Sequence, residues 1–596
     1  MRRRADSKNS FTVSRLFLRL MAVNTLIGLV LPCNQLIDSI LTGKFLGANA
    51  LTVYGLFLPL ESLMMALCGV FSIGSQISCS HLLGRGKLEE AREVTGTAFM
   101  AAGAFSVLCF LVMFVFSNEI AAILGASNDI PGQVSDTASY LRGYALGIPA
   151  IFLSGIMSCL MILEGRRKMS LAMSIGVLAA NAAGDLLNIF VFKQGLFGMA
   201  LATTAANTVC FVIFALIYFI RETKMFRLSA PRLSFSHLST ILKNGTPSFT
   251  YYGSLVVRTA FFNWLILTNF SNDALAAMLV VNRFTTIVDA IIGGAGDGVL
   301  LLGGVLFGEK DLKGQRKLLK TSLAVGALLL LAISAAAIAA SQPIALLFSD
   351  DNDPAFIAET ARAIAVVSVC FVPDVIACIF KKHIQAIGRP RYTSFTNVLC
   401  NVVFACFSAF ALVGVIGSDG IYASYSISYL LIMITHVAYA VLLARKSSRK
   451  GFDIFLFLPD DYEISDNDLW ERTVRNLDEC VEASDEARAL CRDRGVDNRR
   501  AGYVTLLIEE ATSNVVDHGL SKGEGSIIVV KILFDKDRII LSIKDDCRYF
   551  NPVHYYASRQ GGGDGAEDYG LLIVMNFAKK VSYTNCFNLN NLRIEV

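Results

Sequence analysis

Gly84-Arg85-Gly86-Lys87-Leu88 and Gly308-Glu309-Lys310-Asp311-Leu312 are the two stretches that decide the fold, because the second echoes the first 224 residues later. A second pair of basic turns, Gly165-Arg166-Arg167-Lys168 and Gly388-Arg389-Pro390-Arg391, is 223 residues apart. A constant offset over this length indicates an internal repeat. The sequence therefore predicts one structural unit present twice.

Long apolar segments lie on both sides of these turns. A helix needs about 20 apolar residues to cross a bilayer, and 54% of the chain is hydrophobic while only 17% is charged. Twelve segments meet this length, at about 16–43, 50–83, 94–117, 138–163, 169–193 and 196–220, and at 246–270, 275–307, 318–347, 360–380, 392–416 and 419–444. We therefore expect an all-α membrane fold of two six-helix lobes, an architecture common among secondary transporters.

The charge balance changes sign near the end of the last apolar segment. Residues 1–450 carry 36 Lys and Arg against 23 Asp and Glu, whereas residues 451–596 carry 17 against 26. The acidic tail predicts a separate soluble domain that does not bind nucleic acid. The expected divisions are a basic N-terminal tail (1–15), an N-lobe (16–221), a linker (222–245), a C-lobe (246–445), a second linker (446–465) and the C-terminal domain (466–596).

Basic residues gather in alternate loops. They crowd the N-terminus, 85–92, 166–168, 221–243, 310–320, 381–391 and 445–450, while the intervening loops carry little positive charge. Because cytoplasmic loops carry the excess of Lys and Arg, both termini are expected in the cytoplasm, with the lobes in the plasma (inner) membrane.

Three polar side chains lie inside apolar segments of the first lobe: Asp38, Asn181 and Asp185. A carboxylate at the bilayer centre costs about 2.5–3.5 kcal/mol on insertion scales, so such acids indicate function. Asn181 and Asp185 are four residues apart and share a helix face. Facing one cavity, the three groups could bind and release H⁺ or Na⁺. The alternative is that they snorkel to a helix end or make structural hydrogen bonds.

The stretch from Asp38 to Leu51, Asp-Ser-Ile-Leu-Thr-Gly-Lys-Phe-Leu-Gly-Ala-Asn-Ala-Leu, resembles the first-helix signature of the MATE multidrug transporters. Pro59, the Gly165-Arg166 turn and the Asn181-x-x-x-Asp185 spacing fit the same pattern. The resemblance covers about residues 10–445. It implies cation coupling at Asp38, Asn181 and Asp185, with H⁺ or Na⁺ as the ion.

A cation site in the second lobe is less well supported. Asp289, Asp297 and Asp374 could form one, as in another MATE branch, which also uses a glutamate in its seventh helix. Here that helix offers Arg258 and no acid. The two lobes are therefore expected to be chemically unequal.

The acidic tail has its own pattern. Helices are predicted at about 466–494, 499–518 and 570–580, and strands at 526–534, 538–544, 581–584 and 592–596, with a turn at Asn588-Leu589-Asn590-Asn591 between the last two. Glu510 and Asn514 share a helix face, and a glycine-rich stretch, 561–565, precedes Gly570-Leu571. This order predicts an α/β sandwich.

The tail resembles the anti-sigma-factor serine kinases of the GHKL superfamily over about residues 460–596. The resemblance implies an Mg-ATP site in which Asn514 gives Mg²⁺ an oxygen ligand, Glu510 is the catalytic general base and Asp545 reads the adenine amino group. Gly563 and Gly565 would belong to a mobile lid, while Gly570 and Leu571 open a helix that presents N–H groups to phosphate.

Two positions depart from that family's motifs. Cys547 replaces the glycine of Asp-x-Gly, and Asp568 replaces the first glycine of Gly-x-Gly-Leu. The sequence therefore leaves open whether the domain is a serine/threonine kinase, an ATPase or an inactive binding module.

Taken together, these features predict an ion-coupled antiporter in the lipid bilayer that exports amphiphilic small molecules. Its ATP-binding domain would regulate transport or phosphorylate a cytoplasmic protein, such as an anti-sigma-type partner. Two alternatives stay open: a membrane-anchored signalling kinase whose lobes act as a receptor, and a lipid-precursor flippase in which Arg142, Arg258 and Arg283 form a cationic cavity.

Overall fold

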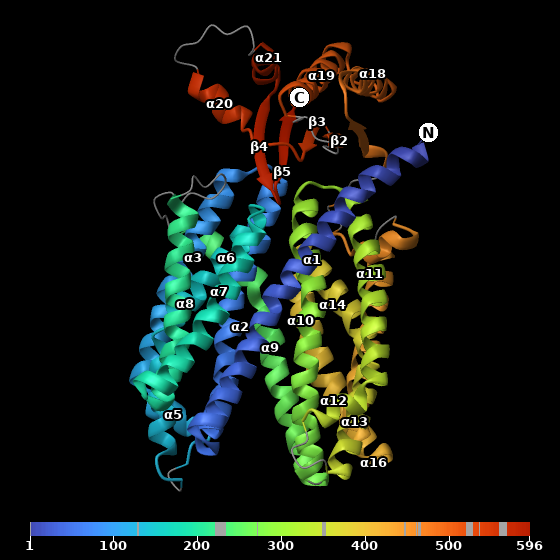
Figure 1. The fold of residues 1–596 in the computed structure, drawn as a ribbon. Helices are drawn as coiled ribbons and strands as arrows, with labels where there is room; N and C mark the ends of the chain where they lie inside the picture. The colour runs from blue at the N-terminus through green and yellow to red at the C-terminus, as the bar shows by residue number, and fades with distance from the viewer. Residues whose placement is uncertain are drawn as a thin grey trace.

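The computed structural model describes residues 2–127, 130–220, 234–270, 272–348, 353–445, 449–459, 462, 466–519, 528–535, 537–559 and 569–596. Figure 1 shows a tall helical bundle with a small α/β domain, coloured orange to red, seated on one end of it. That end, called the domain end below, also carries the start of helix α1.

The first half of the bundle, called the N-lobe, runs from α1 to α8. Its elements are α1 (Arg2–Leu41), η1 (Thr42–Leu46), α2 (Ala48–Gly84), α3 (Leu88–Val115), α4 (Ser117–Ile123), α5 (Gln133–Ala145), α6 (Ile148–Leu163), α7 (Arg167–Leu187), η2 (Asn188–Phe192) and α8 (Gly195–Ile220).

The second half, called the C-lobe, runs from α9 to α17. Its elements are α9 (Phe235–Asn269), α10 (Asn272–Gly308), α11 (Leu312–Ala339), α12 (Ser341–Leu346), α13 (Pro354–Ser368), α14 (Phe371–Ala386), α15 (Pro390–Val398), η3 (Leu399–Phe404), α16 (Ala405–Ile416) and α17 (Asp419–Ala444).

Many of the described helices of the bundle have the length and composition of membrane spans. Nine are long and apolar enough to cross a bilayer, or up to eleven if the bent pairs Gln133–Ala145 with Ile148–Leu163 and Pro354–Ser368 with Phe371–Ala386 each count as one span. Helix α9 corresponds to the seventh of the twelve expected spans. It has 35 residues but is not among these nine helices, and it carries the polar residues Lys243, Asn244 and Arg258.

The two lobes pack together toward the domain end. The backbones approach closely where Gly74 meets Ile241 and where Gly84 meets Val305; a Cβ at either glycine would lie 2.1 or 2.2 Å from a carbonyl oxygen. His81 on α2 donates from Nε2 to Ala386 O on α14 at 2.5 Å. Glycine is therefore required where the lobes touch, because no side chain fits.

The C-terminal domain is a five-stranded antiparallel sheet in the order β1-β2-β3-β5-β4. Its elements are η5 (Asp466–Asp468), β1 (Leu469–Val474), α18 (Leu477–Asp493), α19 (Asn498–Gly519), β2 (Ile528–Asp535), β3 (Arg538–Asp545), α20 (Pro552–Arg559), α21 (Tyr569–Phe577), β4 (Lys580–Cys586) and β5 (Leu589–Glu595). Apolar residues of alternate strand positions, such as Val530, Leu541 and Ile594, form a core with α18 and α19. The expected helical bundle plus α/β sandwich is confirmed.

Two local predictions in this domain were wrong. Residues 469–474, expected to belong to the helix at 466–494, form strand β1, because their β-branched and aromatic side chains complete the sheet beside β2. The last turn comes earlier than expected, at Phe587-Asn588, where both residues have positive φ. Asn590 and Asn591 are strand residues paired with Asp545 and Lys544.

The described part of the expected linker 446–465 packs on the C-lobe. It contains η4 (Gly451–Leu456), whose Asp453 accepts two hydrogen bonds from Arg316 at 2.6 Å each. His383 donates from Nε2 to Leu456 O at 3.1 Å, and Phe457 is buried. These contacts fix the chain where it leaves the membrane lobes.

Candidate functional site

The three polar residues predicted inside the first lobe come together between α1 and α7. Asn181 and Asp185 lie one turn apart on α7, and Asp38 faces them from α1, which packs along α7. All three are buried, with exposed fractions of 0%, 1% and 7% for Asn181, Asp185 and Asp38.

The Asn181 amide joins the two carboxyl groups. Its Nδ2 lies 2.7 Å from Asp38 Oδ1, 3.2 Å from Asp185 Oδ2 and 3.1 Å from Asn34 Oδ1. An amide nitrogen has only two hydrogens for these three acceptors.

Two oxygens of this cluster have no hydrogen-bond partner although they are buried: Asn181 Oδ1 and Asp185 Oδ1. Buried oxygens of this kind cost free energy unless a proton or cation satisfies them. The donor set, made of carboxylate and amide oxygens, therefore fits either H⁺ or a hard cation such as Na⁺.

The structure adds residues that the sequence reasoning missed. Asn34 donates to Asp38 Oδ2 at 3.4 Å and accepts from Asn181. Gln35 donates to Glu61 Oε2 at 2.8 Å. The signal for Asn34 was present, since it precedes Asp38 by one helical turn.

The helix that carries Asn181 and Asp185 loses its regular form directly after them. The π-helical segment η2 begins at Asn188, whose side chain donates to Gly195 O at 2.9 Å and accepts from the Gln194 N–H at 3.1 Å. Such segments occur often at functional sites.

The polar residues of the C-lobe are arranged differently. Asp297 pairs with Lys382 at 2.7 Å. Arg258, considered above for a cationic cavity, donates to Asn401 Oδ1 at 2.9 Å and lies over the ring of Tyr425. Within the residues described here, no group of three or more His, Cys, Asp or Glu side chains could hold a metal ion.

The second candidate site lies in the C-terminal domain. Glu510 and Asn514 are half-buried on one face of α19, which packs on β2, β3 and α21. Asp545 ends β3 on the sheet face that these helices cover, with 6% of its surface exposed. Glu510, Asn514 and Asp545 therefore lie on the side of the sheet that α19 and α21 cover.

Asp545 is held by a buried polar network. Asn590 donates to Asp545 Oδ1 at 2.7 Å, while its own Oδ1 accepts from Tyr583 at 2.6 Å and from Asn585 at 2.7 Å. Burial raises the pKa of the Asp545 carboxyl above its ordinary value, and the bonds from Asn590 and Cys547 offset this in part. Sequence reasoning missed these residues because it assigned Asn590 to a turn.

Cys547 stands where the resembled motif has glycine, and its backbone conformation permits a side chain. Its N–H donates to Asp545 Oδ1 at 3.0 Å, and it is not among the residues with positive φ. A Cβ is therefore tolerated there. Gly570 and Leu571 lie in the first turn of α21, whereas Gly563, Gly565 and Asp568 lie outside the described residues.

Comparisons with known proteins agree with both parts of the chain. The MatE family profile matches residues 25–187 and 254–410. The profile of the histidine kinase-like ATPase domain matches residues 474–595.

Relatives with known names are similar to this chain over most of their own length. The Multidrug export protein MepA of Staphylococcus aureus (strain NCTC 8325 / PS 47) is 26% identical over 400 residues, which are 64% of this chain and 86% of that protein. MepA of Staphylococcus haemolyticus (strain JCSC1435) is 25% identical over 397 residues, with the same coverage.

Among solved structures, a MATE protein in complex with MaL6 superposes with a TM-score of 0.67 at 19% identity, covering 72% of this chain and 96% of that one. A MOP superfamily transporter from Pyrococcus furiosus gives 0.69 at 18% identity, covering 74% and 99%. With two matched repeats that together span more than half of its length, the chain belongs to the MatE family and carries a C-terminal histidine kinase-like ATPase domain.

Proposed function

We propose that this protein is an ion-coupled antiporter that exports amphiphilic small molecules and drugs across the plasma membrane. The observation that carries the proposal is the Asn181 amide between Asp38 and Asp185, buried in the N-lobe with two unpaired oxygens. The names of the MepA relatives support the substrate class.

The chemistry follows from the cost of burying charge. Two carboxylates that share one buried site repel each other, so the site is stable when a proton or Na⁺ neutralises one of them. Loss of that ion would drive α1 and α7 apart or draw water to them. Movement of these helices, in turn, would change the access of substrate between the lobes.

The proposed orientation has the domain end in the cytoplasm. The turns at that end carry Arg85, Lys87, Arg166, Lys310 and Arg389, in agreement with the positive-inside rule. This orientation would also give the C-terminal domain access to ATP.

Transport in proteoliposomes tests the proposal. Efflux of a fluorescent organic cation is expected when either a proton or a sodium gradient is imposed, and the effective gradient identifies the ion. Asp38→Asn and Asp185→Asn are expected to abolish gradient-driven efflux while insertion and yield stay normal. Full efflux by either variant would refute the assignment.

For the C-terminal domain we propose a Mg-ATP site that serves regulation of transport or phosphorylation of a cytoplasmic Ser/Thr partner. Asn514 would give an oxygen to Mg²⁺ and Asp545 would accept a hydrogen bond from the adenine amino group. Bound Mg-ATP would supply a transferable phosphoryl group. Glu510, one turn before Asn514, would accept a proton from water or a hydroxyl.

A further inference from the structure

The sheet of the C-terminal domain has a second face, opposite α18 and α19, and this face lies against the membrane lobes (Figure 1). Residues alternate in direction along a strand, so Lys531 and Leu533 of β2, and Ile540, Ser542 and Lys544 of β3, all lie on it. The face that α18 and α19 cover is mostly apolar, whereas the opposite face carries the cationic side chains of Lys531 and Lys544.

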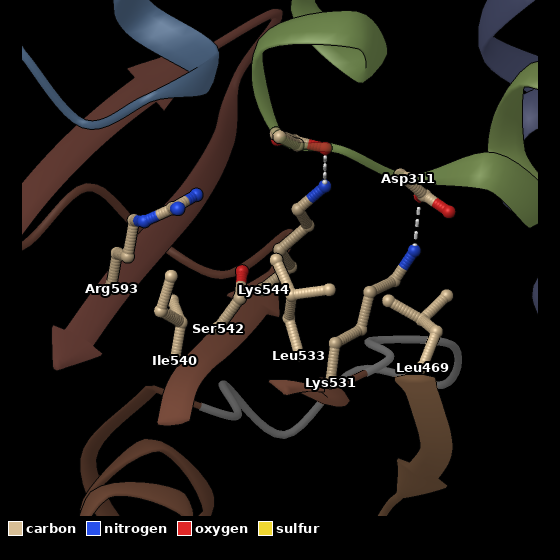
Figure 2. A pocket seen from close by; sticks show the side chains of 9 residues that line it. Asp311, Leu469, Lys531, Leu533, Ile540, Ser542, Lys544 and Arg593 are labelled. Atoms are coloured by element: carbon tan, nitrogen blue, oxygen red, sulfur yellow. Dashed lines mark hydrogen bonds and ion pairs between the residues drawn. The ribbon is translucent and has the colours of Figure 1, made fainter. Parts of the chain in front are cut away.

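The C-lobe contacts this face through the turn between α10 and α11. Lys544 Nζ lies 2.5 Å from Glu309 Oε2, and Lys531 Nζ lies 2.5 Å from Asp311 Oδ2 (Figure 2). Lys310 of the same turn pairs with Asp535 at 3.0 Å. The Asp311 side chain is only 2% exposed, and removing one partner of such a buried pair leaves an uncompensated charge.

The N-lobe contacts the same sheet through β4, β5 and the turn between them. The Phe587 N–H donates to Leu163 O at 2.9 Å, and Asn588 Nδ2 donates to Gly165 O at 3.1 Å. Arg593 Nη1 donates to Gly84 O at 3.1 Å. A Cβ at Gly165 would lie 2.4 Å from the Asn588 nitrogen, so the two backbones touch directly.

The hairpin turn is shaped by this contact. Phe587 and Asn588 have φ of 58° and 63°, as a type I′ turn requires, and Asn tolerates this region well. For a bulky residue such as Phe it is unfavourable. Phe587 is nevertheless only 4% exposed, so its position is explained by packing on the N-lobe.

One domain therefore holds both copies of the repeated turn, Gly84–Leu88 of the N-lobe and Gly308–Leu312 of the C-lobe. It does so where the lobes already touch, at His81 with Ala386 and at Gly74 with Ile241. In two-lobe transporters, alternating access moves one lobe against the other. Opening of the domain end would pull these two turns apart.

From this bridge we infer that the C-terminal domain is a clamp on the two lobes: its sheet keeps the domain end closed, and it must leave at least one lobe before that end opens. The Lys531–Asp311 and Lys544–Glu309 pairs hold the C-lobe, and Phe587, Asn588 and Arg593 hold the N-lobe. The clamp uses the sheet face opposite α18 and α19, whereas the proposed Mg-ATP site lies on the side of these helices, so the test of the clamp needs neither nucleotide nor substrate.

Amide hydrogen exchange on the full chain in lipid nanodiscs, without nucleotide, tests the clamp. Lys531→Ala with Lys544→Ala is compared with Arg488→Ala, which removes a cation from an exposed position on α18. We expect the double variant to exchange about tenfold faster in the turn 305–313 and also in the lobe contacts 70–81 and 241–248, which hold none of the domain contacts named above. Arg488→Ala is expected to match the parent.

Two results would overturn the clamp: unchanged exchange throughout, or faster exchange in 305–313 alone, which would mean a docked domain that does not hold the lobes. Arg593→Ala, on the N-lobe side, is expected to reproduce the effect on 70–81 and 241–248. The charge-swapped variant, Glu309→Lys combined with Lys544→Glu, keeps an ion pair at this place, so its exchange is expected to be as slow as that of the parent. This result separates loss of the pair from misfolding.

Discussion

Replacement of Asn181 by alanine is the sharpest test of the membrane site. The Asn181 amide contacts Asp38, Asp185 and Asn34 at 2.7–3.2 Å and is fully buried. Its two N–H groups can satisfy two of these acceptors, and a hydrogen bond to a charged group contributes about 1.5–3 kcal/mol. Loss of both removes about 3–6 kcal/mol from the arrangement that binds the ion.

Part of this free energy is recovered by relaxation and by water that enters the site, so we work with about 2 kcal/mol, which is two thirds of the lower figure. About 2 kcal/mol corresponds to roughly a 30-fold change. We therefore expect Asn181→Ala to shift the ion concentration for half-maximal transport by about 30-fold or more. Efflux of a fluorescent organic cation from proteoliposomes, measured over a series of proton or sodium gradients, gives that value.

Asn207→Ala is the matched control. Asn207 lies in α8 of the same lobe, and its Nδ2 donates to Thr203 O of its own helix at 2.9 Å. Its loss is expected to leave ion dependence unchanged. If Asn181→Ala also retained the parental ion dependence, the amide would not hold the carboxyl groups and the coupling site would lie elsewhere.

Further predictions concern the C-terminal domain. Asn514→Ala is expected to abolish Mg-ATP binding by the full chain in a fluorescent-nucleotide titration, whereas Glu510→Ala keeps binding and loses turnover; turnover without Glu510 would place the base elsewhere. Asn590→Ala removes one buried hydrogen bond each from Asp545, Tyr583 and Asn585, so the domain should melt at a lower temperature in differential scanning calorimetry, and an unchanged Tm would contradict the network. Burial raises the pKa of Asp311, but Lys531 and Lys544 outweigh it and hold the pKa below its ordinary 3.8. The Lys531–Asp311 pair therefore stabilises docking of the domain above about pH 3.8 and loses that effect as the pH falls further. Hydrogen exchange of residues 305–313, corrected for intrinsic rates, should show equal protection at pH 5 and pH 8 and less protection at pH 3.

The sequence predicted the lobes because bilayer thickness and the repeat leave strong patterns. Long apolar runs and the 224-residue offset need no tertiary information. Asp38 and Asp185 stood out in those runs for the same reason, since each is costly there. That Asn181 lies between them depends on how α1 packs on α7, which periodicity alone does not give.

The C-terminal domain was predicted less completely. Glu510, Asn514 and Asp545 could be predicted because they follow a recognisable order along the chain. Strand β1 and the hydrogen bonds of Asn590 could not be predicted in this way. Residues 469–474 become a strand because β2 offers an edge to pair with. Asn590 pairs with Asp545 across two strands that are 45 residues apart in sequence, and such register is set by burial and turn geometry together.

By itself, then, the sequence determined two membrane lobes, a buried acidic pair in the first, and an ATPase-like domain after them, because each follows from local composition, spacing or repeat. Only the tertiary structure decided that one sheet contacts both lobes. The cations of that sheet, Lys531 and Lys544, look like solvated strand residues in sequence. Their partners, Asp311 and Glu309, lie more than 200 residues away, and folding alone brings such distant charges together.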